Sequence, residues 1–552
     1  MTVPPSLPQW TSRMYPGTVG RDHLGLGEVS SGQILRSLSP SINVATIHPR
    51  YHSFYVFLLD EFWRRDRPRS QKAWVKFYRP REFVFSVAAN LCEEPEHEEM
   101  GAIVGSDRTQ SLAASHPRTF DTTTHYIKQP LGGYGLYYGS VMGEVGLVYP
   151  GGRGLPTPVD VPSERGKELA TAFRAAVEST EYYRKYFDQD EAAVPIGVVR
   201  EYGSRACLCQ LQKRDAPDRE LLRRAFLLEG LDPDARRETM RFFLDLANQT
   251  KDLPVDQDTF RQLVFYGAAE QGGSYSPRPE VESAHRKWRL YQAREYYAFA
   301  LNALWYHLCD WGEAQGGRLR PLPITAFWKH LEKVIDFRKL AKRFDVPAPG
   351  LTATSDLRQL NQWLISVAGT REKEFDQACG ISCPISEHAL YFAASEVDDA
   401  PEVMTAGMLC ILAMTYLRFA QSELRDGPEW AVARMGAEGR LSMEGYLGEV
   451  QRRLGRGQLP VMEFAQWLYS SYVILQHQLV ATRKLPENTF RFRRQNDSLQ
   501  FYPLKNTLVF NDSRFTALST HVHELGFCGD FTEEGHGLTP DGRKLLKEGA
   551  LP

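Results

Sequence analysis

The sequence lacks the features that would place the protein in a membrane or in a secretory route. No segment reaches 18 apolar residues without a charge, so no transmembrane helix is predicted. The stretch from Met1 to Trp10 is rich in proline and has no apolar core of the kind found in secretory signals. The eight cysteines are widely scattered. We therefore expect reduced thiols in a cytoplasmic protein.

The sequence also lacks an excess of charge of either sign. It contains 66 Lys and Arg residues against 68 Asp and Glu residues, which gives a formal net charge of −2. A protein that covers nucleic acid with its whole surface would be basic. Any contact with DNA must therefore come from a local basic patch, and the near-neutral balance favours protein partners.

Motifs for catalysis and cofactor binding are missing as well. The sequence contains no Gly-x4-Gly-Lys-Ser/Thr phosphate loop and no Gly-x-Ser-x-Gly nucleophile turn. The spacing of Cys207-x-Cys209 is wrong for a zinc knuckle, and Cys379-x3-Cys383 has no second Cys or His pair at a suitable distance. The sequence thus predicts no metal site and no cofactor, and free core thiols are the simpler interpretation.

One short pattern, in contrast, occurs twice. Residues Glu144 to Leu147 are followed by a Gly/Pro-rich gap and then by Ser163 to Leu169, and residues Glu524 to Phe527 are followed by a polar gap and then by Thr539 to Leu545. We call these segments the first junction (144–169) and the second junction (524–545). In each, a glycine is expected to end one helix, a hairpin-like wing to follow, and Ser or Thr to cap the next helix.

This order is the outline of a winged helix, a small fold that contacts DNA or other proteins. The free amides at the start of each capped helix are expected to point outward, where they and the adjacent Lys or Arg could meet a phosphate. Any helix–turn–helix connection also uses such residues, and winged helices often join proteins. The pattern therefore predicts a binding module and leaves the ligand open.

The rest of the chain is predicted to be mainly helical. Apolar residues recur at helical spacing in 50–65, 285–311 carries a dense apolar pattern, and 462–483 is predicted to be a long helix. Residues 489–494 alternate Phe with Arg, which predicts a half-buried strand that pairs with 499–502.

We predict a mainly α, multidomain protein with two winged-helix-like α+β units, at about 116–176 and 460–550. The predicted domains are an N-terminal helical domain (1–115), a winged-helix-like domain (116–190), a helical domain (191–457) and a C-terminal winged-helix-like domain (458–552).

Two basic runs could supply phosphate contacts. The run from Arg64 to Lys72 is more simply interpreted as a solvated face. In the run from Arg483 to Arg494, the phenylalanines Phe490 and Phe492 are expected to face inward and the arginines outward. The predicted nucleic-acid-binding residues are Arg483, Lys484, Arg491, Arg493, Arg494, Arg543 and Lys544.

The N-terminal part resembles a bacterial family. The segment from Arg21 to Gly27 reads Arg-Asp-His-Leu-Gly-Leu-Gly, and it is followed by the stretch from Leu38 to Asn43, then Thr46, and then a stretch from Arg50 to Tyr55. This order is similar to the opening of an uncharacterised family with Arg-Asp-Glu-Leu-Gly-Ile-Gly, a Leu-Phe-Pro-Gly stretch and Thr-x-Arg-x-(Arg/Lys)-Tyr-Phe. The family has no assigned activity and tends to lie near restriction and antiphage genes. The resemblance therefore implies a bacterial multi-gene setting and carries over no functional residue.

These observations predict a non-catalytic subunit of a bacterial antiphage defence or DNA-processing system. It would bind DNA, a partner, or both, and its partners would be neighbouring gene products such as a helicase, an ATPase or a nuclease. One alternative is a divergent metal-dependent nuclease that uses Asp60, Glu61 and Lys76, although such carboxylates usually lie on strands and these lie on a predicted helix. The other alternative is a pure assembly scaffold without affinity for nucleic acid.

Overall fold

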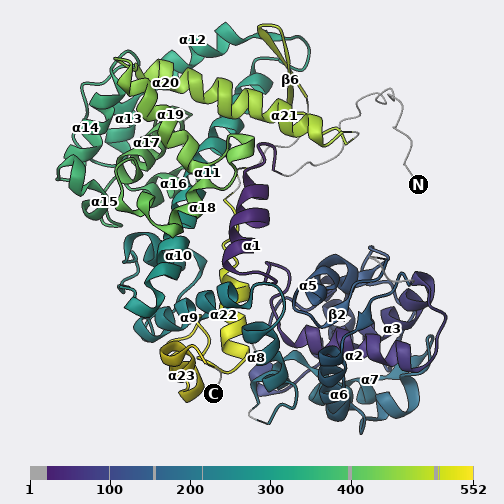
Figure 1. The fold of residues 1–552 in the computed structure, drawn as a ribbon. Helices are drawn as coiled ribbons and strands as arrows, with labels where there is room; N and C mark the ends of the chain where they lie inside the picture. The colour runs from purple at the N-terminus through teal and green to yellow at the C-terminus, as the bar shows by residue number, and fades with distance from the viewer. Residues whose placement is uncertain are drawn as a thin grey trace. The chain divides into compact units, whose positions relative to one another are not determined.

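The computed structural model describes residues 22–97, 100–152, 157–213, 215–395, 401–485, 487–502, 508 and 510–550 (Figure 1). Helices make up 62% of the structure and strands 5%, which confirms the prediction of a mainly α protein. The chain forms two compact units. Unit 1 contains residues 1–35, 261–274 and 285–511, and unit 2 contains residues 36–260, 275–284 and 512–552. Each unit is thus assembled from separated segments, whereas the four predicted domains are consecutive, and the predicted domain 458–552 contributes to both units.

Unit 2 is a helical assembly with two small antiparallel strand pairs. Its main helices are α2 (Arg50–Arg64), α3 (Gln71–Asn90), α4 (Ser106–Ala114), α5 (Gly139–Glu144), α6 (Glu164–Val177), α7 (Ile196–Ala206), α8 (Arg219–Leu228), α9 (Pro233–Gln249), α22 (Phe515–Glu524) and α23 (Pro540–Glu548). Its strands are β1 (Thr119–Asp121), β2 (Val148–Tyr149), β3 (Val161–Pro162) and β4 (Ala193–Pro195). Strand β1 pairs with β4 and strand β2 with β3, so the two pairs form separate sheets.

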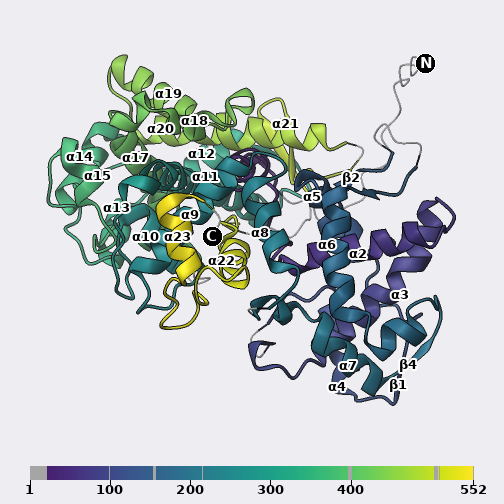
Figure 2. The same cartoon turned by 60° about the horizontal axis from the view of Figure 1, so that its bottom comes forward.

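The core of unit 2 is built on the predicted helix at 50–65, which the structure has as α2. Every residue of α2 from its first position to Phe62 is buried, so the helix lies inside the unit. Its main neighbour is α6, as Figure 2 shows. The Phe173 ring of α6 lies 5.2 Å from Phe57 and 6.0 Å from Phe54 of α2. Phe173 belongs to a stripe with Leu169 and Val177 at four-residue spacing, which gives α6 one apolar face.

Helices α3 and α7 approach each other closely in the same unit. A Cβ added to Gly203 of α7 would stand 2.7 Å from the carbonyl oxygen of Ala88 on α3, so only glycine fits at this crossing. Both helices end near this point, α3 at Asn90 and α7 at Ala206. The residues that follow the two helices, Cys92 and Cys207, are therefore brought together.

The C-terminal helices α22 and α23 pack on α9, as both views show (Figures 1 and 2). Phe515 of α22 stacks on Phe243 of α9, with ring centroids 6.0 Å apart. The Phe531 ring lies 5.7 Å from Phe515 and 6.1 Å from Phe243, so it closes the cluster. The end of the chain is thus part of the core of unit 2.

Unit 1 is built around long apolar helices. Its main helices are η1 (Glu28–Ile34), α11 (Glu282–Ala314), α12 (Ile324–Val334), α13 (Phe337–Arg343), α14 (Leu357–Val367), α15 (Phe375–Ala378), α16 (Glu387–Ser395), α17 (Pro401–Phe419), α18 (Ala431–Arg434), α19 (Met443–Gly455), α20 (Val461–Leu468), η11 (Tyr469–Ile474), α21 (Leu475–Arg483), and most of α10 (Gln257–Tyr266). Helix α17 contacts α12, α13, α14, α15, α16 and α19, so it forms the centre of this bundle. Among the described residues, no helix combines the length and the apolar character needed to cross a bilayer.

The predicted helix at 462–483 is confirmed as the continuous run of α20, η11 and α21. The strand pair predicted after it is confirmed too: β6 (Phe492–Gln495) pairs antiparallel with β7 (Ser498–Phe501). The hairpin turns at Asn496, which adopts a positive φ of 52°, a conformation that asparagine tolerates. Strand β5 (Leu322–Pro323) joins the other edge of β7, which makes a three-stranded sheet.

Candidate functional site

The two junctions share one backbone arrangement. Gly146 and Gly526 both follow the end of a helix and adopt left-handed φ values of 83° and 79°. The amide of the residue after each glycine donates to the carbonyl five residues before it, at 3.0 Å in both junctions. This is the bond that closes a Schellman motif, and it needs the glycine because a Cβ disfavours the left-handed conformation. The prediction that both glycines end a helix is confirmed.

The second half of each junction is also the same. The hydroxyl of Ser163 donates to the Gly146 carbonyl at 2.8 Å, and the hydroxyl of Thr539 donates to the Gly526 carbonyl at 2.9 Å. Each of these hydroxyls also accepts the amide three residues further on, at 3.1 Å in both cases. The predicted caps are therefore confirmed, and each hydroxyl joins the end of one helix to the start of the next.

The capped amide belongs to a glycine in both junctions, and the reason is steric. A Cβ on Gly166 would stand 2.1 Å from the Leu147 carbonyl oxygen, and a Cβ on Gly542 would stand 1.9 Å from the Phe527 carbonyl oxygen. The start of each second helix is thus pressed against the turn that precedes it. The capped amide is therefore buried against its own junction, and the expectation that the free amides of these helix starts meet a phosphate stays a prediction.

A short flap connects the two halves of each junction. In the first junction, β2 and β3 pair antiparallel with Val148 opposite Pro162. In the second junction, Cys528 and Leu538 form a single antiparallel bridge at the same place. The first junction thus has a short strand pair and the second a single bridge, and the winged-helix assignment of both stays a prediction.

Helix α8 and the turn after it contact both junctions. The amide of Leu231 donates to the Glu144 carbonyl of the first junction at 2.7 Å. The guanidinium of Arg223 donates to the Leu525 carbonyl of the second junction at 2.7 Å and to the Asp541 carboxylate at 3.0 Å. The last carbonyls of the two helices are thus satisfied by a backbone amide in one junction and by a buried arginine in the other.

The predicted basic run from Arg483 to Arg494 lies in unit 1 and does not form one exposed patch. Arg491 is 1% exposed, and its guanidinium donates to Glu313 Oε1 at 2.9 Å and to the Tyr502 carbonyl at 2.5 Å. The expectation that the arginines of this run face outward was therefore wrong for Arg491. The physical reason is that β6 begins only at Phe492, so Arg491 lies before the alternating part of the chain.

The other residues of that run differ in exposure. Arg493 is half-buried and lies over the Phe490 ring at 4.2 Å, whereas Arg494 is exposed. Arg483 is exposed at the end of α21, and the Lys484 amine donates to the Asp22 carbonyl at 2.9 Å. Both of these residues line a cavity of about 630 Å³ whose wall also carries Glu28 and Glu438. The remaining predicted residues, Arg543 and Lys544, are exposed on α23 in unit 2.

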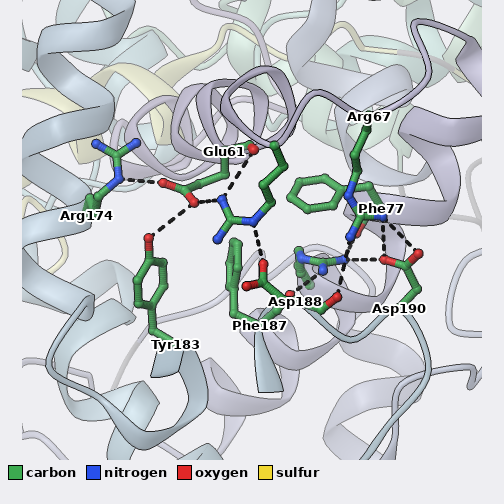
Figure 3. A network of polar contacts seen from close by, with 10 residues as sticks. Glu61, Arg67, Phe77, Arg174, Tyr183, Phe187, Asp188 and Asp190 are labelled. Atoms are coloured by element: carbon green, nitrogen blue, oxygen red, sulfur yellow. Dashed lines mark hydrogen bonds and ion pairs between the residues drawn. The ribbon is translucent and has the colours of Figure 1, made fainter. Parts of the chain in front are cut away.

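Two arginines of the first basic run are held in ion pairs, whereas Arg64, Arg69 and Lys72 of the same run are exposed. Arg67 donates to both carboxylate oxygens of Asp190 at 2.9 Å and lies over the Phe77 ring at 4.6 Å (Figure 3). Arg65 pairs with Asp188 and lies over the Phe187 ring at 5.1 Å. The expectation of a solvated face was wrong for these two arginines, because carboxylates more than 120 residues later lie opposite them.

The carboxylates of the nuclease alternative are occupied by cations. Arg174 of α6 bonds both Asp60 and Glu61, and Arg65 bonds the second oxygen of Glu61. The Tyr183 hydroxyl also donates to that oxygen at 3.2 Å (Figure 3). A metal-dependent nuclease needs these oxygens for its cations. This arrangement therefore favours a structural role for Asp60 and Glu61.

Sequence reasoning missed a cluster of three cysteines and one histidine in unit 2. In the described part of the chain, Cys92, His97, Cys207 and Cys209 are the one group of at least three potential metal ligands whose ligand atoms all lie within 4.8 Å of one another. Cys92 follows α3, and His97 ends the short helix η2 (Pro95–His97). Cys207 caps α7, and Cys209 lies in η5 (Leu208–Gln212). The spacing signals, Cys-x4-His and Cys-x-Cys, lie more than 100 residues apart and are each too short to be distinctive.

The thiols of this cluster influence one another. Hydrogen bonds donated by the thiols of Cys207 and Cys209 lower the pKa of the Cys92 thiol. Burial raises the pKa of the Cys207 thiol. One member of the group is thus predisposed to be a thiolate, which is the form of cysteine that binds metals.

Comparison with known proteins does not assign this arrangement to a family. No protein-family model, no curated protein and no solved structure matches the chain.

Proposed function

We propose that the chain is a non-catalytic binding subunit of a bacterial multi-gene antiphage defence or DNA-processing system. The observation that supports this proposal is the repeated hydrogen-bond scheme of the two junctions, in which helix, flap and capped helix follow in the same order. We interpret the junctions as parts of two winged-helix-like units. Such units act by binding, and the setting follows the resemblance of the N-terminal residues to a family found near antiphage and restriction genes.

We further propose that the first junction binds a protein partner. Its first helix, η3 (Tyr134–Tyr138) continued by α5, contains no Lys or Arg. Leu136 and Tyr137 of this helix are 42% and 37% exposed, and Tyr149 on strand β2 is 58% exposed. Exposed aromatic and aliphatic side chains are typical of protein interfaces, whereas contact with DNA phosphates needs basic residues. The exposed chemistry of this junction thus favours a protein surface.

Co-expression with the products of the neighbouring genes tests this proposal. Changing Leu136 and Tyr137 together to Ser should weaken the complex by at least about tenfold, because buried aromatic contacts dominate interface energies. The matched control is Val44→Ser, which alters a side chain that is 50% exposed elsewhere in unit 2. Equal affinity of the double variant and the native chain for every neighbouring product would contradict the proposal.

DNA binding is the second candidate, and one observation favours it. Arg543 follows the second capped glycine directly, and Lys167 occupies the same position after the first, so both junctions place an exposed cation there. A gel-shift titration should then show weaker binding when Arg543 and Lys544 are changed to Ala, and a further loss when Arg483 and Arg494 are changed. Changing Lys72 and Lys76 to Ala is the control. If affinity for DNA is the same in all variants, these residues have no part in DNA binding.

A further inference from the structure

We propose that Cys92, His97, Cys207 and Cys209 bind one zinc ion in a closed, tetrahedral site that ties the ends of α3 and α7 together. The proposal is independent of the function proposed above, because it concerns how unit 2 is held together. It depends on four side chains from two distant parts of the sequence that meet at one point.

The distances within the cluster agree with a tetrahedral zinc site. The sulfur atoms of Cys92 and Cys209 lie 3.7 Å apart, and Cys207 Sγ lies 3.2 Å from His97 Nδ1. With Zn–S bonds of about 2.3 Å and Zn–N bonds of about 2.0 Å, tetrahedral angles require edges of about 3.8 Å between sulfurs and about 3.5 Å between sulfur and nitrogen. These two edges are close to the tetrahedral values, and all four ligand atoms lie within 4.8 Å of one another, which is near enough for them to surround one ion.

The backbone explains how a Cys-x-Cys pair can supply two ligands. Helix α7 ends at Ala206, and Cys207 has φ −52° and ψ 150°, which is an extended conformation. Cys209 then lies in the following short helix η5, so the chain bends between the two cysteines. In a continuous helix, residues two apart point in different directions. The bend after α7 removes this obstacle and directs both thiols to one side.

Polar contacts around the cluster support the ligands. The Gln210 amide group donates to Cys209 Sγ at 3.6 Å. The Lys213 amine pairs with the Glu94 carboxylate at 2.7 Å, which joins the loop after α3 to the segment after α7. Contacts of this kind orient the ligands of metal sites.

The chemistry of the ligands identifies the class of metal and its role. Three thiolates and one imidazole suit zinc and are poor ligands for magnesium or calcium, which prefer oxygen. Since four protein side chains fill a tetrahedral shell, no position remains for water or substrate, and the site is structural rather than catalytic. A structural ion at this place would stabilise unit 2 by fixing the crossing of α3 and α7.

Metal analysis of the full-length protein, purified without chelator, tests the proposal. We expect about one zinc ion per chain, as for other sites with four protein ligands. Loss of a residue that only supports a metal ligand typically lowers metal affinity by about 10- to 100-fold. Cys209→Ser removes a ligand itself, so we expect it to lower zinc affinity by more than that. The matched control is Cys528→Ser, which changes a buried cysteine of the same unit outside the cluster and should keep the zinc.

A second measurement does not depend on whether a variant folds. Native protein stripped with a chelator should have a lower Tm, recover it on addition of zinc, and show the visible bands of tetrahedral thiolate-bound Co²⁺ when cobalt is added instead. The proposal is overturned if the chain contains no zinc and the stripped protein takes up neither ion. It is equally overturned if metal-free protein, kept under reducing conditions, has the same Tm before and after zinc is added.

Discussion

The two junctions have the same hydrogen bonds but present different surfaces. Leu136 and Tyr137 are exposed on the helix that enters the first junction, whereas most of α22, which enters the second, is buried against α9 and the aromatic cluster around Phe515. The exposed tip of the second flap carries Glu533 and Glu534. The same backbone arrangement thus leaves apolar side chains exposed at the first junction, whereas at the second it holds the C-terminal end of the chain in unit 2.

The residue before each turn shows the same contrast. Glu144 pairs with exposed Arg36 at 2.7 Å, whereas Glu524 is buried and accepts a hydrogen bond from His48 Nδ1 at 2.7 Å. The other ring nitrogen of His48 bonds the Gly101 carbonyl at 2.8 Å. The glutamate at the same position of the repeated pattern therefore forms a surface ion pair in the first junction and a buried hydrogen bond with a histidine in the second.

The largest effect should come from the capped glycines, and it should be equal in the two junctions. Gly166→Ala and Gly542→Ala each force a Cβ into a backbone carbonyl, and we expect each to lower the free energy of unfolding of unit 2 by about 3 kcal/mol. Gly197→Ala on α7 is the control, because a Cβ there meets nothing within 4 Å. Denaturant titration measures all three. A large loss at only one junction would show that the two arrangements are not equivalent.

The next effect should distinguish the junctions. Arg223→Met removes the buried guanidinium from the Leu525 carbonyl, and we expect a loss of about 2 kcal/mol because a buried acceptor is left without its charged donor. Arg224→Met is the control, since its side chain is 53% exposed and its ion pair with Glu229 is long at 3.7 Å. Hydrogen exchange should show faster opening of α22 in the Arg223 variant. Unchanged exchange there would contradict the anchoring role.

The buried glutamate should make the second junction sensitive to pH. Burial opposes a charge on His48, but the Glu524 carboxylate outweighs this effect and raises the pKa of His48 above 6.5. The extra stability of the pair is therefore fully present below pH 6.5 and is lost as the pH rises through the raised pKa of His48.

The matched variants for this prediction are Glu524→Gln and Glu144→Gln. At pH 6 we expect the first to cost about 1.5 kcal/mol, because a charge-assisted buried hydrogen bond is lost, and the second to cost less than about 0.5 kcal/mol. Thermal unfolding between pH 6 and pH 9 should show the difference between native protein and Glu524→Gln becoming smaller. A difference that grows with pH would contradict the assignment.

The smallest effect should again be common to both junctions. Ser163→Ala and Thr539→Ala each remove a cap that also bonds the preceding glycine carbonyl, and we expect a cost of about 1 kcal/mol in each case. Ser70→Ala at the N-cap of α3 is a useful reference, because among the described residues its hydroxyl makes the capping bond to the Ala73 amide and no bond to a preceding helix. Equal costs at all three positions would mean that the bond across the junction contributes nothing.

Much of the fold could be predicted from short segments. The helix at 50–65 and the strand pair after 489 follow from apolar spacing, and the ends of the junction helices follow from a glycine and a hydroxyl residue. The site could not be predicted in the same way. Arg491 alternates with phenylalanines in the sequence but is buried against Glu313, which belongs to a helix almost 180 residues earlier.

The sequence by itself determined the helices and the two repeated junctions, because helical periodicity, capping bonds and left-handed glycines depend on residues within about one or two turns of each other. Only the tertiary structure decided which junction is exposed, which arginines are neutralised and which cysteines meet. Each of those outcomes depends on contacts between segments far apart in the chain, as between Cys92 and Cys209 or between Arg67 and Asp190. No local pattern records such contacts, because they arise only when helices such as α3 and α7 pack together.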